Sequence, residues 1–128
     1  VGFSNGGFWA TFMAGTKQVN ASSSHYGVWQ FGPSATADLK GYPVKYIKKD
    51  TRPLLILHPK KDKVQKYKWA KPYITKVAKK SSKVEVHYYE KGGHAWHNKK
   101  YKKGVGYNRK IYEDAMARTI TFFNKYKK

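Results

Sequence analysis

Hydrophobic residues along the chain form patterns typical of strands separated by helices. Residues 53–58 contain the uninterrupted run Leu-Leu-Ile-Leu, and an apolar run of this length predicts a strand buried on both faces of a parallel sheet. Residues 83–89 alternate between apolar and polar side chains instead, which predicts a second strand. Its apolar face carries Val84, Val86 and Tyr88. A third strand of small residues is predicted over 19–25, and an irregular stretch follows over 27–41.

Three other segments have the spacing of helices. Residues 8–14 are apolar and end at Gly15, and residues 67–80 repeat apolar positions every three or four residues. The last helix is predicted from an amphipathic face made of Tyr112, Met116, Ile120 and Phe123. Because strands and helices alternate, the fold class is α/β, with right-handed crossovers and a parallel sheet flanked by helices.

Composition limits the choice of protein class. The chain has 128 residues, enough for one domain with a real core. It contains no cysteine, which excludes disulfides and a cysteine nucleophile and slightly favours a cytoplasmic location. It also contains no apolar run of about 18 residues, so no membrane span is predicted.

The charge of the chain is unusual. Lys and Arg number 27 against 7 acidic residues, which gives a net charge of +20. Only Arg52, Arg109 and Arg118 are arginines, so 24 of the 27 basic residues are lysines. Such a chain could bind nucleic acid or another anionic surface, or it could simply have a solvated lysine-rich surface. Sequence-specific contacts to nucleic acid favour arginine, so nucleic acid is the less favoured partner.

A glycine-rich segment stands directly before the first predicted helix. Its residues 2–7 read Gly-Phe-Ser-Asn-Gly-Gly. A serine in G-x-S-x-G at a strand-to-helix turn is held with its hydroxyl exposed above the sheet. Glycines two residues before and after Ser4 let such a turn close. The helix start and the Asn5 backbone N–H favour negative charge that develops nearby. Ser4 is therefore a candidate nucleophile, and Asn5 is a candidate oxyanion donor.

Two further residues complete a possible catalytic set in the order Ser, Asp, His. Asp62 follows the predicted strand 53–58, and His94 follows the strand 83–89 after a glycine pair. Because the carboxyl ends of parallel strands lie at one edge of the sheet, the three side chains are expected to meet there. Trp29 and Trp96 are predicted to contact substrate. His87 and His97 accompany His94, but no carboxylate completes a ligand set, so no metal site is predicted.

At these residues the chain resembles the α/β-hydrolase superfamily, and within it the dienelactone hydrolase family. The resemblance covers essentially the whole chain, and its clearest segments are 1–7, 53–62 and 86–96. It implies that Ser4 is the nucleophile, that His94 is the general base and acid, and that Asp62 orients the imidazole. It also implies one partial domain over 1–128, beginning at the nucleophile elbow, because the family has several strands before that point. The N-terminal half of the fold is then a partner of this chain.

The sequence therefore predicts a serine hydrolase that acts on small-molecule esters or related acyl substrates and needs no cofactor. The alternative is a catalytically silent basic module that binds nucleic acid or an anionic surface. A lysine-rich segment over 97–106 follows His94. It either favours acidic substrates or is only a solvated loop.

Overall fold

Four parallel strands form a single sheet in the order β1-β2-β3-β4. The computed structural model describes residues 1–29 and 43–127, so most of the predicted irregular stretch 27–41 lies outside the described residues. The strands are β1 (Gly2–Phe3), β2 (Ser22–His25), β3 (Leu54–Pro59) and β4 (Val84–Tyr89). The register places Ser24 opposite both Gly2 and Ile56, and Leu57 opposite His87.

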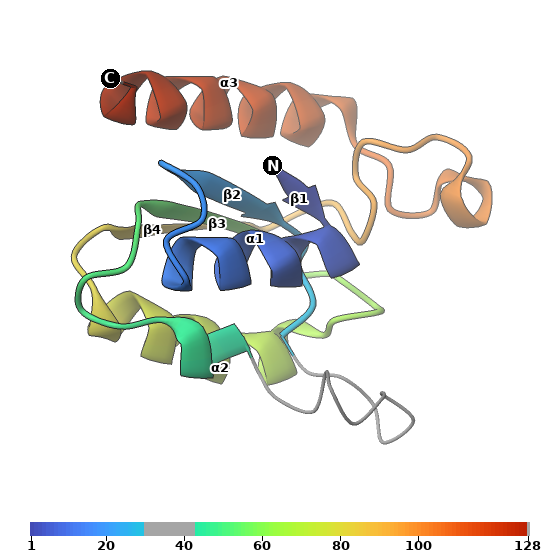
Figure 1. Cartoon of the computed structure of the whole chain (residues 1–128). Helices are drawn as coiled ribbons and strands as arrows, with labels where there is room; N and C mark the ends of the chain where they lie inside the picture. The colour runs from blue at the N-terminus through green and yellow to red at the C-terminus, as the bar shows by residue number, and fades with distance from the viewer. Residues whose placement is uncertain (30–42, 128) are drawn as a thin grey trace.

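Helices cover both faces of the sheet, as Figure 1 shows. Helices α1 (Asn5–Gly15) and α2 (Tyr67–Lys80) lie on one face, and α3 (Arg109–Tyr126) lies on the other. Short 3₁₀ turns are found at η2 (Pro43–Tyr46) and η3 (Tyr101–Gly104). The α/β class, the parallel sheet and the flanking helices predicted from the sequence are confirmed. No helix in the described part of the chain has the length and apolar character needed to cross a membrane.

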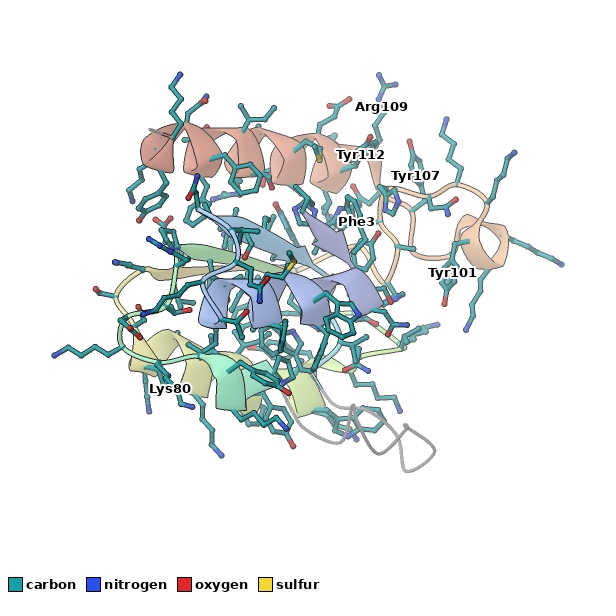
Figure 2. The ribbon with its side chains drawn as sticks, in the orientation of Figure 1. Phe3, Lys80, Tyr101, Tyr107, Arg109 and Tyr112 are labelled. Carbon is teal, nitrogen blue, oxygen red and sulfur yellow. The ribbon has the colours of Figure 1, made fainter. Side chains whose placement is uncertain are left out.

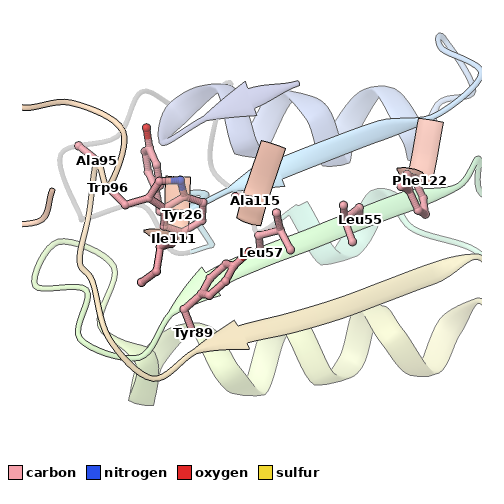
Figure 3. Close-up of a cluster of buried hydrophobic side chains, with 9 residues drawn as sticks. All are labelled: Tyr26, Leu55, Leu57, Tyr89, Ala95, Trp96, Ile111, Ala115 and Phe122. Carbon is pink, nitrogen blue, oxygen red and sulfur yellow. The ribbon is translucent and has the colours of Figure 1, made fainter. Parts of the chain in front are cut away.

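Strand β3 is the centre of the core because both of its faces are buried. Leu54 and Ile56 pack with α1 and α2, while Leu55 and Leu57 pack beneath α3. All four leucine and isoleucine side chains are at most 6% exposed. Figure 3 shows the second of these clusters, in which Leu55 and Leu57 meet Ala115 and Phe122 of α3. The apolar run in the sequence was therefore interpreted correctly, and the predicted apolar face of β4 packs on the α2 side.

The buried face of α3 differs from the predicted one. The residues that pack inward are Ile111, Ala115, Thr119 and Phe122. Two members of the predicted face, Tyr112 and Ile120, are 38% and 57% exposed. The two sets are offset by one residue, which turns the helix by about 100°. Both sets have helical spacing, and packing against Leu55 and Leu57 selects the first.

Candidate active site

Ser4 lies at a sharp turn between β1 and α1. Its backbone has φ 55° and ψ −116°, a conformation that non-glycine residues seldom adopt and that costs on the order of 1–3 kcal/mol. The turn is closed by hydrogen bonds from Ser4 N to His25 O and from Gly7 N and Val28 N to Ser4 O. The strained conformation presents the Ser4 hydroxyl to a cavity beside the carboxyl ends of the strands.

The glycines around this turn have different roles from those predicted. A Cβ on Gly2 would lie 1.8 Å from Gly6 O, so Gly2 is required for the turn to close. A Cβ on Gly6 would meet nothing within 4 Å, whereas one on Gly7 would lie 2.4 Å from Gly27 Cα. The prediction that the two glycines flanking Ser4 both relieve crowding holds for Gly2 and is wrong for Gly6. Gly7 is the crowded position on the helix.

His94 connects the serine to a buried carboxylate. Its Nδ1 lies 2.9 Å from Asp62 Oδ2, and its Nε2 lies 2.8 Å from Ser4 Oγ. A carboxylate only accepts hydrogen bonds, so Nδ1–H donates to Asp62 and Nε2 is left to accept the Ser4 proton. His94 is 8% exposed and Asp62 is 4% exposed. The structure thus brings together three residues that the sequence separates by as many as 90 positions.

The loop after β3 holds Asp62 firmly in place. Asp62 Oδ1 accepts hydrogen bonds from the backbone N–H groups of Val64 and Gln65, each at 2.8 Å. Gln65 in turn accepts from Trp29 N through its side-chain oxygen, at 3.1 Å. The buried His58 donates from Nε2 to Gln65 O at 2.9 Å. These contacts leave Oδ2 free to orient His94.

Asn5 is the first residue of α1 and lines the same cavity as Ser4. Backbone N–H groups in the first turn of a helix have no acceptor within the helix, and the helix dipole places partial positive charge there. The Asn5 N–H is therefore in the region where a negative oxygen next to Ser4 would be stabilised.

Two site residues were not identified from the sequence. Tyr26 and His97 both line the cavity, and the Tyr26 hydroxyl donates a hydrogen bond to His97 Nδ1. Burial raises the pKa of Tyr26 above its ordinary value, with the nearby Asp62 carboxylate adding to the effect, so the phenol stays protonated. Burial lowers the pKa of His97, which favours the neutral acceptor form. The Phe3 ring stacks on the His97 ring, with 4.6 Å between the ring centroids. The His97 ring also contacts the ring of Tyr112 on α3. Phe3 and Tyr112 are labelled in Figure 2.

The two tryptophans predicted to contact substrate lie elsewhere. Trp29 and Trp96 are both completely buried, in the two hydrophobic clusters on opposite faces of the sheet. Neither is among the residues that line the cavity beside Ser4. The prediction for these two residues is corrected accordingly, because each indole fills a core site. The cavity wall is formed instead by Phe3, Tyr26, Val28, Val64 and Tyr101.

Two further histidines, His25 and His58, are fully buried in the protein. His25 is fully buried and donates from Nε2 to Thr119 Oγ1 at 2.9 Å, since the Thr119 hydroxyl proton is used on Ala115 O. Burial lowers the pKa of His25 to about 4 and also lowers that of His58. Among the described residues, no group of three or more His, Asp or Glu side chains is arranged to hold a metal ion.

A parallel sheet flanked by helices, with a serine on a strained strand-to-helix turn, defines the α/β-hydrolase class. The model of the dienelactone hydrolase family matches residues 1–127, and the chain belongs to that family. No curated protein is similar enough in sequence to be matched.

Solved structures with the same fold come from several organisms. A Klebsiella pneumoniae protein proposed to be a dienelactone hydrolase is 20% identical, with a TM-score of 0.78 over 98% of this chain and 50% of that chain. Esterase 2 of Thermogutta terrifontis in its apo form is 16% identical, with a TM-score of 0.70 over 97% of this chain and 53% of the esterase chain. An esterase of Pyrococcus furiosus is 13% identical, with a TM-score of 0.69 over 98% of this chain and 52% of the esterase chain. The chain thus spans about half the length of these proteins.

Proposed function

We propose that this chain carries the nucleophile, the general base and the orienting acid of a serine esterase. The hydrogen-bonded series Ser4–His94–Asp62 at the carboxyl edge of the sheet is the observation that supports this most strongly. The neutral His94 tautomer, with Nε2 free to accept, is the form that a general base needs. Membership of the dienelactone hydrolase family agrees with hydrolysis as the reaction class.

In this proposal Ser4 Oγ attacks the ester carbonyl carbon while His94 Nε2 takes the hydroxyl proton. The resulting oxyanion accepts a hydrogen bond from the Asn5 backbone N–H. The bond to the leaving alkoxide then breaks, and His94 returns the proton to that oxygen. Water next attacks the acyl-serine with His94 as base, which releases the acid and restores the Ser4 hydroxyl. The proposed steps use the Ser4 and His94 side chains, the Asn5 backbone N–H and a water molecule, so the proposal includes no cofactor.

A second oxyanion donor is proposed to come from the part of the fold that this chain does not include. An oxyanion hole is usually built from two donors, and in this class the second is a backbone N–H from a loop that follows an early strand. The chain spans about half of the solved relatives, which is consistent with a donor outside it. Removal of one oxyanion donor lowers the turnover number by a factor of about 10²–10³. We therefore propose that the 128 residues alone are a weak esterase.

The direct test is hydrolysis of p-nitrophenyl butyrate by the full-length protein and by this chain. Ser4→Ala should lower the rate by about 10³-fold or more. Trapping with a fluorophosphonate should label the protein with Ser4 and leave Ser4→Ala unlabelled. An undiminished rate in Ser4→Ala would exclude the assignment.

The basic binding module remains the second candidate because of the charge on α2. This helix contains Lys68, Lys71, Lys76, Lys79 and Lys80 and no acidic residue. Binding to phosphates should weaken steeply between about 50 and 200 mM salt, whereas hydrolysis of a neutral ester should change little. A salt series with both assays separates the two functions.

A further inference from the structure

The cavity beside Ser4 has a wall that is largely apolar and aromatic, with a volume of about 480 Å³. Within the described residues, no Lys, Arg, Asp or Glu side chain lines it, although the chain as a whole has a net charge of +20. The rings of Phe3, Tyr26 and Tyr101 belong to the wall, together with the imidazole of His97. In a pocket of this kind, the few polar groups determine how a ligand is oriented.

The Tyr26 hydroxyl determines which nitrogen of His97 carries the proton. Tyr26 is 1% exposed, and within the described residues its hydroxyl forms a hydrogen bond only with His97 Nδ1. If Nδ1–H donated to the phenol oxygen, the phenol proton would be buried without an acceptor, so the phenol donates and Nδ1 accepts. Burial raises the pKa of Tyr26 and lowers that of His97, which keeps both groups neutral near pH 7. A neutral imidazole that accepts at Nδ1 carries its proton on Nε2.

The Nε2–H group of His97 is a donor without an acceptor among residues 1–29 and 43–127. The imidazole is only half-buried and its Nε2 is open to solvent, whereas partnerless polar atoms of the core such as Trp96 Nε1 are enclosed. The Phe3 ring stacks on the imidazole, and the Tyr112 ring packs against it at a steep angle, so its orientation is restricted. A donor that is already held in place loses little freedom when a ligand accepts from it.

Two strained residues position this pair beside the proposed reaction centre. Tyr26 has φ 38°, and Ala95, which lies between His94 and His97 in the chain, has φ 59°. Non-glycine residues seldom adopt this left-handed region, and such strain is found mainly at functional sites. The Tyr26 ring packs edge-on against His94, with 4.9 Å between the ring centroids. The same tyrosine therefore contacts the proposed general base and holds the His97 imidazole.

From this arrangement we propose that His97 Nε2–H donates a hydrogen bond to an uncharged oxygen of the substrate, such as an ether, hydroxyl or carbonyl oxygen. The scissile ester reacts at Ser4, and the second oxygen lies at His97. Tyr26 is a positioning residue, because it acts on the substrate through His97. An uncharged acceptor suits the site, since no cationic side chain of the described residues lines the wall. This inference rests on the proposed function, because it assigns a substrate class to the same site.

The tautomer of His97 is measured first, because this measurement does not depend on activity. Long-range ¹H–¹⁵N NMR spectra of the full-length protein at neutral pH distinguish protonated from unprotonated imidazole nitrogens. Nε2 should be protonated in the parent protein and Nδ1 should not. Tyr26→Phe keeps the ring and removes the hydroxyl, so both tautomers should then be populated. The control Tyr67→Phe on α2 should leave the His97 signals unchanged. Protonation of Nδ1 in the parent protein would overturn the proposal.

Recognition of the oxygen is tested with pairs of esters in which an ether oxygen replaces one CH₂ group. On the acyl side, p-nitrophenyl methoxyacetate, 3-methoxypropanoate and 4-methoxybutanoate are compared with the butanoate, pentanoate and hexanoate. On the alcohol side, 2-methoxyethyl acetate is compared with butyl acetate. The ratio of kcat/KM within each pair is divided by the same ratio in His97→Phe, which cancels the intrinsic reactivity of the esters. This quotient should be about three to ten for at least one pair, mainly through KM, as expected for one neutral hydrogen bond.

A matched variant separates the hydrogen bond from general effects of substituting a histidine. His97→Phe keeps an aromatic ring beside Phe3 and removes both ring nitrogens. The control His87→Phe makes the same change on β4, at a half-buried histidine that does not line the cavity. Its quotient should stay near one for every pair. Quotients near one for all pairs in His97→Phe, or equal quotients in the two variants, would also overturn the proposal.

Failure of the proposed function gives a different result. If no ester is hydrolysed with dependence on Ser4, the esterase assignment fails, and ligand binding decides the role of His97. The amides of the three methoxy acids are then titrated into the parent protein, with butanamide, pentanamide and hexanamide as comparisons, while the His97 Nε2 signal is followed by NMR. A shift with an ether amide that its hydrocarbon partner does not produce supports the donor. Equal responses within all three pairs, including no response, exclude it.

Discussion

Gly7 on α1 packs directly against Gly27, in the loop after β2. A Cβ on Gly7 would lie 2.4 Å from Gly27 Cα and 2.6 Å from Ser24 Oγ. The contact lets the first turn of α1 approach the end of β2, and the same loop donates Val28 N to Ser4 O. The close approach of two glycines thus holds the turn that presents the candidate nucleophile.

This contact predicts opposite effects for two neighbouring substitutions. Gly7→Ala should destabilise the protein by about 2 kcal/mol or more, because backbone atoms must move to admit the methyl group. Gly6→Ala should be neutral or stabilise by about 0.5–1 kcal/mol, because the site is open and alanine favours the helix. Urea denaturation of both variants measures the difference. Similar destabilisation by both would contradict the packing described for Gly7.

The contacts of Asp62 predict the effect of removing its charge. In Asp62→Asn the side-chain oxygen can still accept from Val64 N, but the amide group can no longer orient and stabilise the imidazolium of His94. We expect p-nitrophenyl butyrate turnover to fall by about 10³–10⁴-fold with KM nearly unchanged. Asp50→Asn, which removes an exposed carboxylate paired with Lys17, is the control and should keep full turnover. Full activity in Asp62→Asn would exclude the proposed role.

Buried histidines predict that the protein loses stability in mild acid. His25 has a pKa of about 4 in the folded protein against about 6.5 in the unfolded chain, so the unfolded chain binds more protons between these values. Stability is therefore complete above about pH 6.5 and falls as the pH decreases toward 4, by about 2 kcal/mol at pH 5 from His25 alone. The pKa of His58 is lowered in the same direction, again by burial.

Thermal melts at a series of pH values, in buffers of equal ionic strength, measure this dependence. His25→Gln keeps a side-chain donor for Thr119 but does not titrate, so its melting temperature should vary less between pH 7 and 5. A parent protein whose stability is flat over this range would contradict the buried, neutral state of His25.

Exposed apolar side chains predict that the 128-residue chain associates with itself. Val1 on the sheet edge, Trp9 on α1 and Ile120 on α3 are 55%, 46% and 57% exposed. Among the residues that the structure describes, strand β1 pairs only with β2, which leaves backbone groups on its other edge without a strand partner there. Light scattering coupled to size-exclusion chromatography should show dimers or larger species. Trp9→Gln combined with Ile120→Lys should shift the chain toward monomer, and a monomeric parent chain at all concentrations would refute the prediction.

The sequence alone determined the elements and the order of the candidate site residues. The run in β3 predicted a strand buried on both faces, and the turn at Ser4, the acid after β3 and the histidine after β4 follow from local patterns. Parallel strands place their carboxyl ends at one edge, so the convergence of Ser4, Asp62 and His94 could also be predicted.

Tertiary packing decided what local periodicity leaves open. Helix α3 has two stripes with helical spacing, and only contact with Leu55 and Leu57 selects Ile111, Ala115 and Phe122. Trp29 and Trp96 are equally suited to a pocket or a core by composition, and the neighbours that surround them place both in the core. The cavity beside Ser4 brings Phe3 and Tyr101 together from separate segments. Such a site depends on distances between segments far apart in the chain, and no pattern within either segment specifies those distances.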